Sequence, residues 1–153
     1  MITSRTRRIA ATVVFALFAP LASAQLVLAP PVARWVDEAK QQVPLLDLAA
    51  LKAAVDANET GLLLDVREPA ELAASGMLPG AINMPRGIVE LAVWAKVGYP
   101  NNTNLGQKIT VYCGTTWRSA LAAKSLKDLG FTNVQLANIR VEEWRASGYP
   151  MVK

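Results

Sequence analysis

A chain of 153 residues with a hydrophobic fraction of 52% has the size of one domain and enough apolar side chains to fill a core. It contains no histidine and a single cysteine, which excludes a Ser-His-Asp triad, a Cys-His pair, an intramolecular disulfide and the usual zinc ligand sets. The formal net charge is +4, but no basic patch indicates binding to nucleic acid.

Residues 1–24 have the pattern of a secretory signal peptide. Three arginines within residues 5–8 form a basic start, an apolar run follows over residues 9–21, and Ala-Ser-Ala at residues 22–24 offers a cleavage site. An uncleaved membrane anchor is the alternative, although the run is shorter than the roughly 20 residues that span a bilayer. We expect cleavage before Gln25, a periplasmic protein with no membrane contact, and a net charge that falls from +4 to +1 because three arginines and no acid are removed.

Residues 25–44 are expected to form an N-terminal leader and a short helix. Pro30-Pro31 should block regular structure, and the helix is predicted over Arg34–Val43, with Trp35, Val36 and Ala39 on its apolar side. Strands and helices then alternate over residues 45–153. The predicted strands are 45–46, 62–66, 81–84, 109–112 and 134–136, and the predicted helices are 48–58, 69–75, 88–97, 117–129 and 141–147.

Local signals support several of these boundaries. Asp47 can cap the helix that follows it, Gly76 can end the helix 69–75, and residues 99–107 form a polar loop. In helix 117–129, Ala122, Leu126 and Leu129 share an apolar stripe. The alternation predicts an α/β fold, a mainly parallel central sheet of about five strands with helices on both faces.

The only cysteine lies where chemistry is expected in such a fold. Ligands bind at the carboxyl ends of parallel strands, and Cys113 directly follows the predicted strand 109–112. The backbone N–H groups of the loop from Gly114 through Thr115, Thr116 and Trp117 can point inward at the N-terminus of a helix. That positive potential should lower the thiol pKa and make the cysteine a nucleophile without a histidine, provided that the thiol is reachable.

Arg118 strengthens this hypothesis, because a cation in the first turn of a helix opposes the helix dipole and often marks a functional site. Structural alternatives stay open. Cys113 could be a small buried hydrophobe, Arg118 could extend to solvent, and Trp117 could cover the core. Asp65 and Arg67, at the end of the strand 62–66, could be an ion pair beside a helix start.

Several motifs, in this order along the chain, resemble a single-domain rhodanese over residues 45–152. They are Leu64–Glu71 (LDVREPAE), Gly76–Pro85 (GMLPGAINMP), Val111-Tyr112-Cys113, Arg118-Ser119, Leu129-Gly130-Phe131, Asn133-Val134, Trp144 and Gly148-Tyr149-Pro150. The resemblance implies a sulfurtransferase that needs no cofactor. Cys113 would take a sulfane sulfur from a donor such as thiosulfate as a persulfide, and a thiophilic acceptor such as cyanide would remove it.

The resemblance also assigns roles around the cysteine. The amides of Gly114 to Arg118 would hold the persulfide or the departing anion, which suits a dianionic donor. Asp65, Arg67, Arg86 and Arg140 are candidate supporting residues. The implied partners are a small anionic sulfur donor, a thiophilic acceptor and, as a further option, a protein in a sulfur relay.

This sequence departs from the family pattern at four places. Thr116 stands where a glycine is common, and because a β-branched residue tolerates a positive φ poorly, we expect a loop of different shape. Met77 replaces a histidine, which should affect packing only. Ile139-Arg140 replaces Gly-Gly and could narrow the mouth of the site or add charge to it. Trp117 could restrict an acceptor or stack on it.

Two alternative functions are considered for this sequence. Related phosphatases and arsenate reductases resemble this family but use a loop one residue longer, so a phosphate should fit the loop from Cys113 to Arg118 poorly. A binding or sulfur-carrier module that has lost turnover is the second alternative. Because inactive members of the family usually lack the cysteine, its presence here favours the enzyme.

Overall fold

The computed structural model describes residues 27–153, so the expected signal peptide lies outside the described residues. The strands are β1 (Leu45–Leu46), β2 (Leu62–Asp65), β3 (Ala81–Asn83), β4 (Ile109–Tyr112) and β5 (Val134–Ala137). The helices are α1 (Pro30–Lys40), α2 (Leu48–Asp56), α3 (Pro69–Ser75), α4 (Val89–Ala92), α5 (Trp117–Asp128) and α6 (Val141–Ala146), with 3₁₀ turns η1 (Arg86–Ile88) and η2 (Val93–Lys96). Within residues 27–153, no helix combines the length and the apolar character that crossing a bilayer requires.

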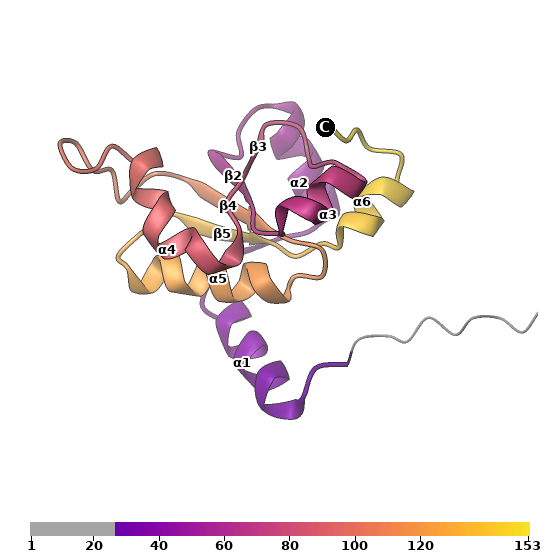
Figure 1. The fold of residues 1–153 in the computed structure, drawn as a ribbon, viewed down its shortest axis with the longest axis horizontal. Coiled ribbons are helices and arrows are strands. Elements are labelled where there is room, and N and C mark those ends of the chain that lie inside the picture. Colours follow the sequence, from indigo (N-terminus) through magenta and orange to yellow (C-terminus); the bar gives the residue numbers. More distant parts are fainter. Residues whose placement is uncertain (1–26) are drawn as a thin grey trace, which may run out of the picture.

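The five strands form one sheet in the order β1-β5-β4-β2-β3, and every pair is parallel. Helices lie on both sides of it (Figure 1). The predicted α/β class with a mainly parallel sheet of about five strands is therefore confirmed. The short apolar strands are typical of a sheet buried on both faces, and β4 is buried at all four positions.

The alternating side chains of the strands divide the core in two. Val111 and its neighbours face one side, where residues of α1, α4 and α5 cover them. Tyr112 and Leu63 face the other side, against residues of α2 and α6 that include Leu51 and Trp144. Each face is thus closed by its own apolar cluster, and the polar residues gather at the carboxyl edge of the sheet.

The N-terminal helix differs from the expectation. α1 begins at Pro30, so the two prolines start the helix instead of blocking it. Proline fits the first helical positions because it lacks an N–H that would be unpaired there anyway. Val36 and Ala39 are buried in the first cluster as expected, whereas Trp35 is 54% exposed and does not belong to the buried side.

Two further elements also differ. The single helix predicted over residues 88–97 is a series of η1, α4 and η2, in which only Val89–Ala92 is α-helical. Leu129 lies just beyond the end of α5 and is 37% exposed, so the apolar stripe of that helix ends at Leu126. The other predicted elements are present with ends that differ by at most two residues.

The strand order places a switch point at the carboxyl edge, between β2 and β4. After β2 the chain runs through α3 to the neighbouring strand β3, and after β4 it runs through α5 to β5 in the opposite direction. α5 covers one face of the sheet, and residues of α2 and α6 cover the other. In open α/β sheets such a switch point is where ligands bind.

Candidate functional site

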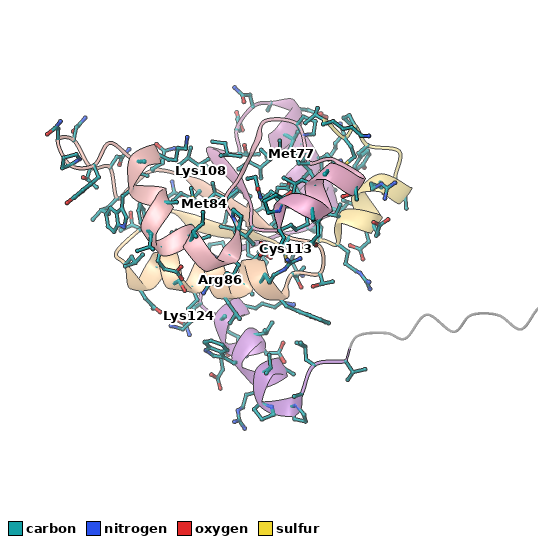
Figure 2. All side chains as sticks on the ribbon, viewed as in Figure 1. Met77, Met84, Arg86, Lys108, Cys113 and Lys124 are labelled. Atoms are coloured by element: carbon teal, nitrogen blue, oxygen red, sulfur yellow. The ribbon has the colours of Figure 1, made fainter. Side chains whose placement is uncertain are left out.

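Cys113 lies at this switch point, at the end of the central strand β4 (Figure 2). Its exposed fraction is 0%, and it belongs to the apolar cluster on the α5 side of the sheet. The expectation of a reachable thiol is therefore not met in this conformation. A reagent can meet the sulfur only when the side chains at the rim of the loop move.

The loop that follows, Cys113–Arg118, contains the threonine that was expected to tolerate a positive φ poorly. Thr116 has φ 74° and ψ −16°, the left-handed conformation that a glycine adopts without strain. Its carbonyl accepts hydrogen bonds from the backbone N–H of Ala120 at 2.9 Å and from the hydroxyl of Ser119 at 3.1 Å. These two bonds, together with 93% burial, hold the threonine in the strained conformation.

We predict that Thr116→Gly stabilises the protein by up to about 1 kcal/mol. The left-handed conformation costs a non-glycine residue about 1–2 kcal/mol. Glycine avoids this cost, but its unfolded chain has a greater entropy, which offsets about 0.5–1 kcal/mol of the gain. Urea unfolding measures the change, and a destabilised variant would show that packing of the threonine side chain outweighs the strain. Higher turnover in the same variant would show that the threonine tunes the loop.

Arg118 contacts a carboxylate of the protein. Its two terminal nitrogens donate to Oε1 and Oε2 of Glu71 on α3, at 2.7 and 2.6 Å. This pair joins α5 to α3, and both of its members lie 3.8 Å from the position that a Cβ on Gly114 would occupy. The hydrogen bond to Glu71 raises the pKa of Arg118 above its usual value, and the charge of Glu71 adds to the increase.

Glu71 was not among the predicted site residues, although it lies within the motif at residues 64–71. The hydrogen bond from Arg118 lowers its pKa from the usual 4.5 to about 2. Because the pKa is lowered in the folded state, the pair stabilises the fold above about pH 4.5 and loses that contribution as the pH falls through 2.

Glu71→Gln should therefore flatten the dependence of stability on pH between 4.5 and 2. At neutral pH the cost should stay below about 1 kcal/mol, because the two side chains are 34% and 40% exposed and solvent screens the pair. Urea unfolding of both proteins across this range checks the prediction. Parallel losses in the two proteins would contradict it.

Asp65 and Arg67 form a buried ion pair at the end of β2, with exposed fractions of 0% and 3%. The guanidinium donates to Asp65 Oδ2 at 2.6 Å, to the carbonyl of Gly76 at 2.7 Å and to the hydroxyl of Ser75 at 2.8 Å. Burial lowers the pKa of Arg67, but the hydrogen bond and the charge of Asp65 outweigh it and leave the pKa raised. The geometry thus supports the alternative of a structural ion pair, which here ties the end of β2 to the end of α3.

The remaining predicted residues are spread around the same edge. Arg86 donates to Glu90 at 2.7 Å and to Ser125 at 3.0 Å, which joins η1 to α5. Ile139 is 1% exposed and packs in the second core cluster, so it does not narrow the mouth of the site. Arg140 is exposed before α6, and its backbone N–H donates to Glu143. Trp117 is half-buried and packs against the first cluster.

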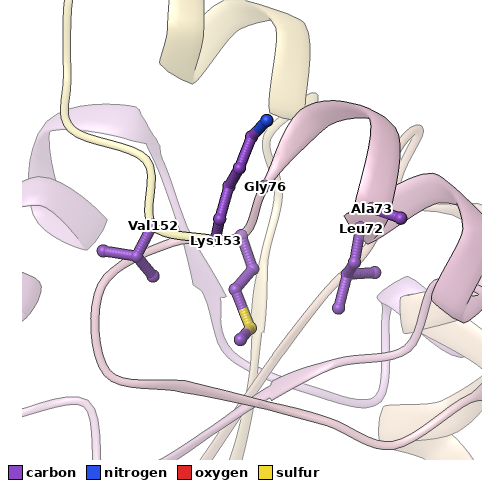
Figure 3. Close-up of a pocket in the computed structure, with 6 residues that line it drawn as sticks. Leu72, Ala73, Gly76, Val152 and Lys153 are labelled. Atoms are coloured by element: carbon purple, nitrogen blue, oxygen red, sulfur yellow. The ribbon is translucent and has the colours of Figure 1, made fainter.

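A small apolar cavity lies away from the cysteine, where α3 meets the C-terminal segment (Figure 3). Its volume is about 200 Å³, and its walls are Leu72, Ala73, Gly76, Met77, Val152 and Lys153. Met77 and Val152 exchange two backbone hydrogen bonds of 2.8 Å beside it. This packing role agrees with the expectation that Met77 affects packing only, and no residue of the Cys113–Arg118 loop lines the cavity.

The fold and the site define a class of protein, namely an α/β domain with a lone cysteine at the switch point of a parallel sheet. The model of the rhodanese-like domain family matches residues 47–147, and the chain belongs to this family. YrkF of Bacillus subtilis, described as a candidate sulfur carrier protein, is 33% identical over 97 residues, which cover 63% of this chain and 48% of YrkF. The chain therefore spans about half the length of this curated relative.

Two solved structures extend the comparison. The polysulfide-sulfur transferase homodimer of Wolinella succinogenes is 28% identical with a TM-score of 0.65, covering 80% of this chain and 87% of that one. A Rhodopseudomonas palustris protein of unknown function, described as a possible tyrosine phosphatase, is 27% identical with a TM-score of 0.68, covering 83% and 98%. The relatives of this chain thus include a sulfurtransferase.

Proposed function

We propose that this chain is a sulfurtransferase that moves a sulfane sulfur from thiosulfate or a similar donor to a thiophilic acceptor through a persulfide on Cys113. The observation that carries the proposal is the position of the sulfur. It lies at the switch point of the sheet, at the start of a helix N-terminal loop, and within electrostatic reach of Arg118. The nucleophile that the reaction needs at this position is a thiolate.

The first half-reaction is an attack on the donor. The Cys113 thiolate attacks the outer sulfur of thiosulfate, a new S–S bond forms to Sγ, and the S–S bond of thiosulfate breaks with its electron pair on sulfite. The cysteine is left as a persulfide anion. Donor and departing sulfite are both dianions, so the loop amides and the Arg118 guanidinium stabilise negative charge throughout the step.

The second half-reaction returns the enzyme to its starting state. A thiophilic nucleophile such as cyanide attacks the terminal sulfur of the persulfide and leaves as thiocyanate, and the electron pair of the broken S–S bond returns to Sγ as the thiolate. Charge and electrons balance over both steps, so neither a metal nor a redox cofactor is required. The polysulfide donor named for the Wolinella succinogenes relative belongs to the same chemical class as thiosulfate.

Both half-reactions require access to a sulfur that is fully buried. The Arg118–Glu71 pair joins α5 to α3 beside Gly114, so we propose that the donor approaches by displacing Glu71 from the guanidinium. An anionic donor can replace one carboxylate partner of Arg118 by another without leaving the cation unpaired. Glu71 would then select for anionic donors, because a neutral molecule offers Arg118 no replacement.

Thiocyanate formation from cyanide tests the proposed function. Thiosulfate and an inorganic polysulfide serve as donors, and we expect turnover with at least one of them in the wild type and none in Cys113→Ala. Equal thiocyanate formation by the two proteins would contradict a role of the cysteine. Absence of para-nitrophenyl phosphate hydrolysis by the same samples is the expected result for the phosphatase alternative, since the loop has six residues from Cys113 to Arg118.

A sulfur-carrier module is the second candidate, and the similarity to YrkF favours it. A carrier would hold the persulfide and transfer it to a protein thiol while turning over small acceptors poorly. Exposure of the persulfidated chain to cyanide and to a small-molecule thiol separates the two. Rapid regeneration of the thiolate by either acceptor supports the enzyme, and a long-lived persulfide supports the carrier.

We further propose that the chain works in the periplasm. The support is the signal-like pattern of residues 1–24. The mass of the protein recovered from the periplasm should correspond to a chain that begins at Gln25. A full-length chain in the membrane fraction would favour the uncleaved anchor.

A further inference from the structure

Arg140 is exposed, and it is the one arginine of residues 27–153 that forms no ion pair. The other five each contact a carboxylate, and they are Arg34, Arg67, Arg86, Arg118 and Arg145. The two carboxylates that follow Arg140 in α6 are engaged elsewhere, Glu142 with Arg145 and Glu143 with a backbone N–H. The guanidinium of Arg140 is therefore available to an anion from outside the chain.

The backbone of Arg140 is held firmly although its side chain is exposed. Its N–H donates to Glu143 Oε2 at 2.9 Å, and its carbonyl accepts the backbone N–H groups of Glu143 at 2.9 Å and Trp144 at 3.2 Å. The residues on either side, Ile139 and Val141, are 1% and 2% exposed. A ligand that binds this cation therefore orders a side chain only, and not a segment of backbone.

Arg140 lies at the same edge of the sheet as Cys113. β4 and β5 are parallel neighbours, and Val111 pairs with Leu136. Cys113 and Asn138 come two residues later along the chain, and Arg140 follows Asn138 by two more. Adjacent strands lie about 4.8 Å apart and two residues span at most about 7 Å, so the Cα atoms of Arg140 and Cys113 are within about 12 Å of each other. This separation suits a substrate that carries a charge a few bonds from its reacting sulfur.

We infer that Arg140 is a specificity-determining residue that binds a negative group of the sulfur acceptor, and that the preferred acceptor is a thiol that also carries a carboxylate. The inference rests on the proposed function and names the class of its acceptor. In the transfer, the acceptor thiolate attacks the outer sulfur of the persulfide, a new S–S bond forms, and the electron pair of the old S–S bond returns to Cys113 Sγ. The acceptor leaves as a persulfide, and Arg140 contacts its carboxylate, away from the reacting sulfurs.

The donor does not need this second cation. The charge of thiosulfate lies on the group directly bonded to the transferred sulfur, where the loop amides and Arg118 serve it. A thiol acceptor must place its sulfur in line with the S–S bond that breaks, so the rest of the molecule extends outward from the loop. Because Ile139-Arg140 stands where the family pattern has Gly-Gly, the contact is a property of this chain.

Three thiols of similar size test the inference as acceptors, since 3-mercaptopropionate is anionic, 2-mercaptoethanol is neutral and cysteamine is cationic. Loss of sulfur from the persulfidated chain, followed by intact mass, gives a rate for each thiol. Arg140→Gln should lower the rate with 3-mercaptopropionate, relative to that with 2-mercaptoethanol, by about two- to fivefold, the effect of one exposed ion pair. The relative rate with cysteamine should rise. Each thiol is compared across proteins, so its own basicity cancels.

Two further variants serve as controls. Arg140→Lys keeps the charge and should keep most of the preference for the anionic thiol. Arg145→Gln replaces the paired, exposed arginine of α6 and should leave the relative rates unchanged. Equal relative rates in the wild type and in Arg140→Gln would overturn the inference.

A pair of alkylating reagents separates this inference from the proposed function, because it needs no persulfide. Iodoacetate and iodoacetamide attack the same thiol and differ in charge, so the ratio of their rates in one protein is independent of loop opening and of thiol ionisation. Arg140→Gln should lower this ratio, and Arg145→Gln should not. An unchanged ratio would overturn the selection of anions by Arg140 even if sulfur transfer proceeds. A lowered ratio in a chain that forms no persulfide would overturn the proposed function instead, so the two proposals fail separately.

Discussion

Replacing Arg67 with alanine is expected to lower the free energy of unfolding by about 3–5 kcal/mol, because it leaves a carboxylate buried without its cation. Asp65 has an exposed fraction of 0%, and the guanidinium also supplies the hydrogen bonds to Ser75 and to the carbonyl of Gly76. A loss of this size is a large part of the stability of a typical domain. Chemical unfolding followed by circular dichroism measures it.

An exposed ion pair of the protein provides the control for this prediction. Arg145 and Glu142 are 47% and 71% exposed, so Arg145→Ala should change the stability by less than about 0.5 kcal/mol. Adding Asp65→Asn to the Arg67 variant should restore part of the stability, because the unpaired charge is then removed. Similar small losses in both single variants would show that the buried pair does not support the fold.

Arg118→Ala is expected to lower kcat/KM for thiosulfate by about 100-fold or more, the effect of removing one donor that stabilises developing negative charge. Stability should fall by less than about 1 kcal/mol, since the pair with Glu71 is partly exposed. Steady-state thiocyanate formation and urea unfolding give the two values. Arg118→Lys should recover little of the activity, because an ammonium group cannot replace a bidentate guanidinium.

The role of Arg118 is decided by comparing the loss of activity with the loss of stability in Arg118→Ala. Glu71 occupies both terminal nitrogens of the guanidinium in this structure. If Arg118 acts in the reaction, the Arg118→Ala substitution lowers activity far more than stability. Losses of equal free energy would make Arg118 a structural residue that joins α5 to α3.

Much of the fold could be predicted from the sequence, because local sequence patterns determine many of its strands and helix ends. A run of buried apolar residues predicts a strand such as β4, and Asp47 accepts the backbone N–H of Ala50 at 2.8 Å as a helix cap should. The start of α1 was predicted wrongly, because a proline can either block a helix or begin one. The packing of α1 on α5 decides between the two. The 3₁₀ turns beside α4 have no clear sequence signature.

The candidate site could be predicted in part. Cys113 and its loop follow from the end of a buried strand, but Glu71 lies 47 residues before Arg118, and no local pattern connects the two. The conformation of Thr116 could not be predicted for a different reason. Its side chain disfavours a positive φ, yet hydrogen bonds to its carbonyl from Ser119 and Ala120 hold it there. Such contacts between distant elements or across a tight loop are set by the fold as a whole.

The most direct test of the account is the mass of the intact protein before and after incubation with thiosulfate. The account predicts that the wild type gains the mass of one sulfur atom, that cyanide removes this gain and produces thiocyanate, and that Cys113→Ala shows no gain. An unchanged mass of the folded wild type after thiosulfate and after polysulfide would contradict the persulfide on which the proposed function depends.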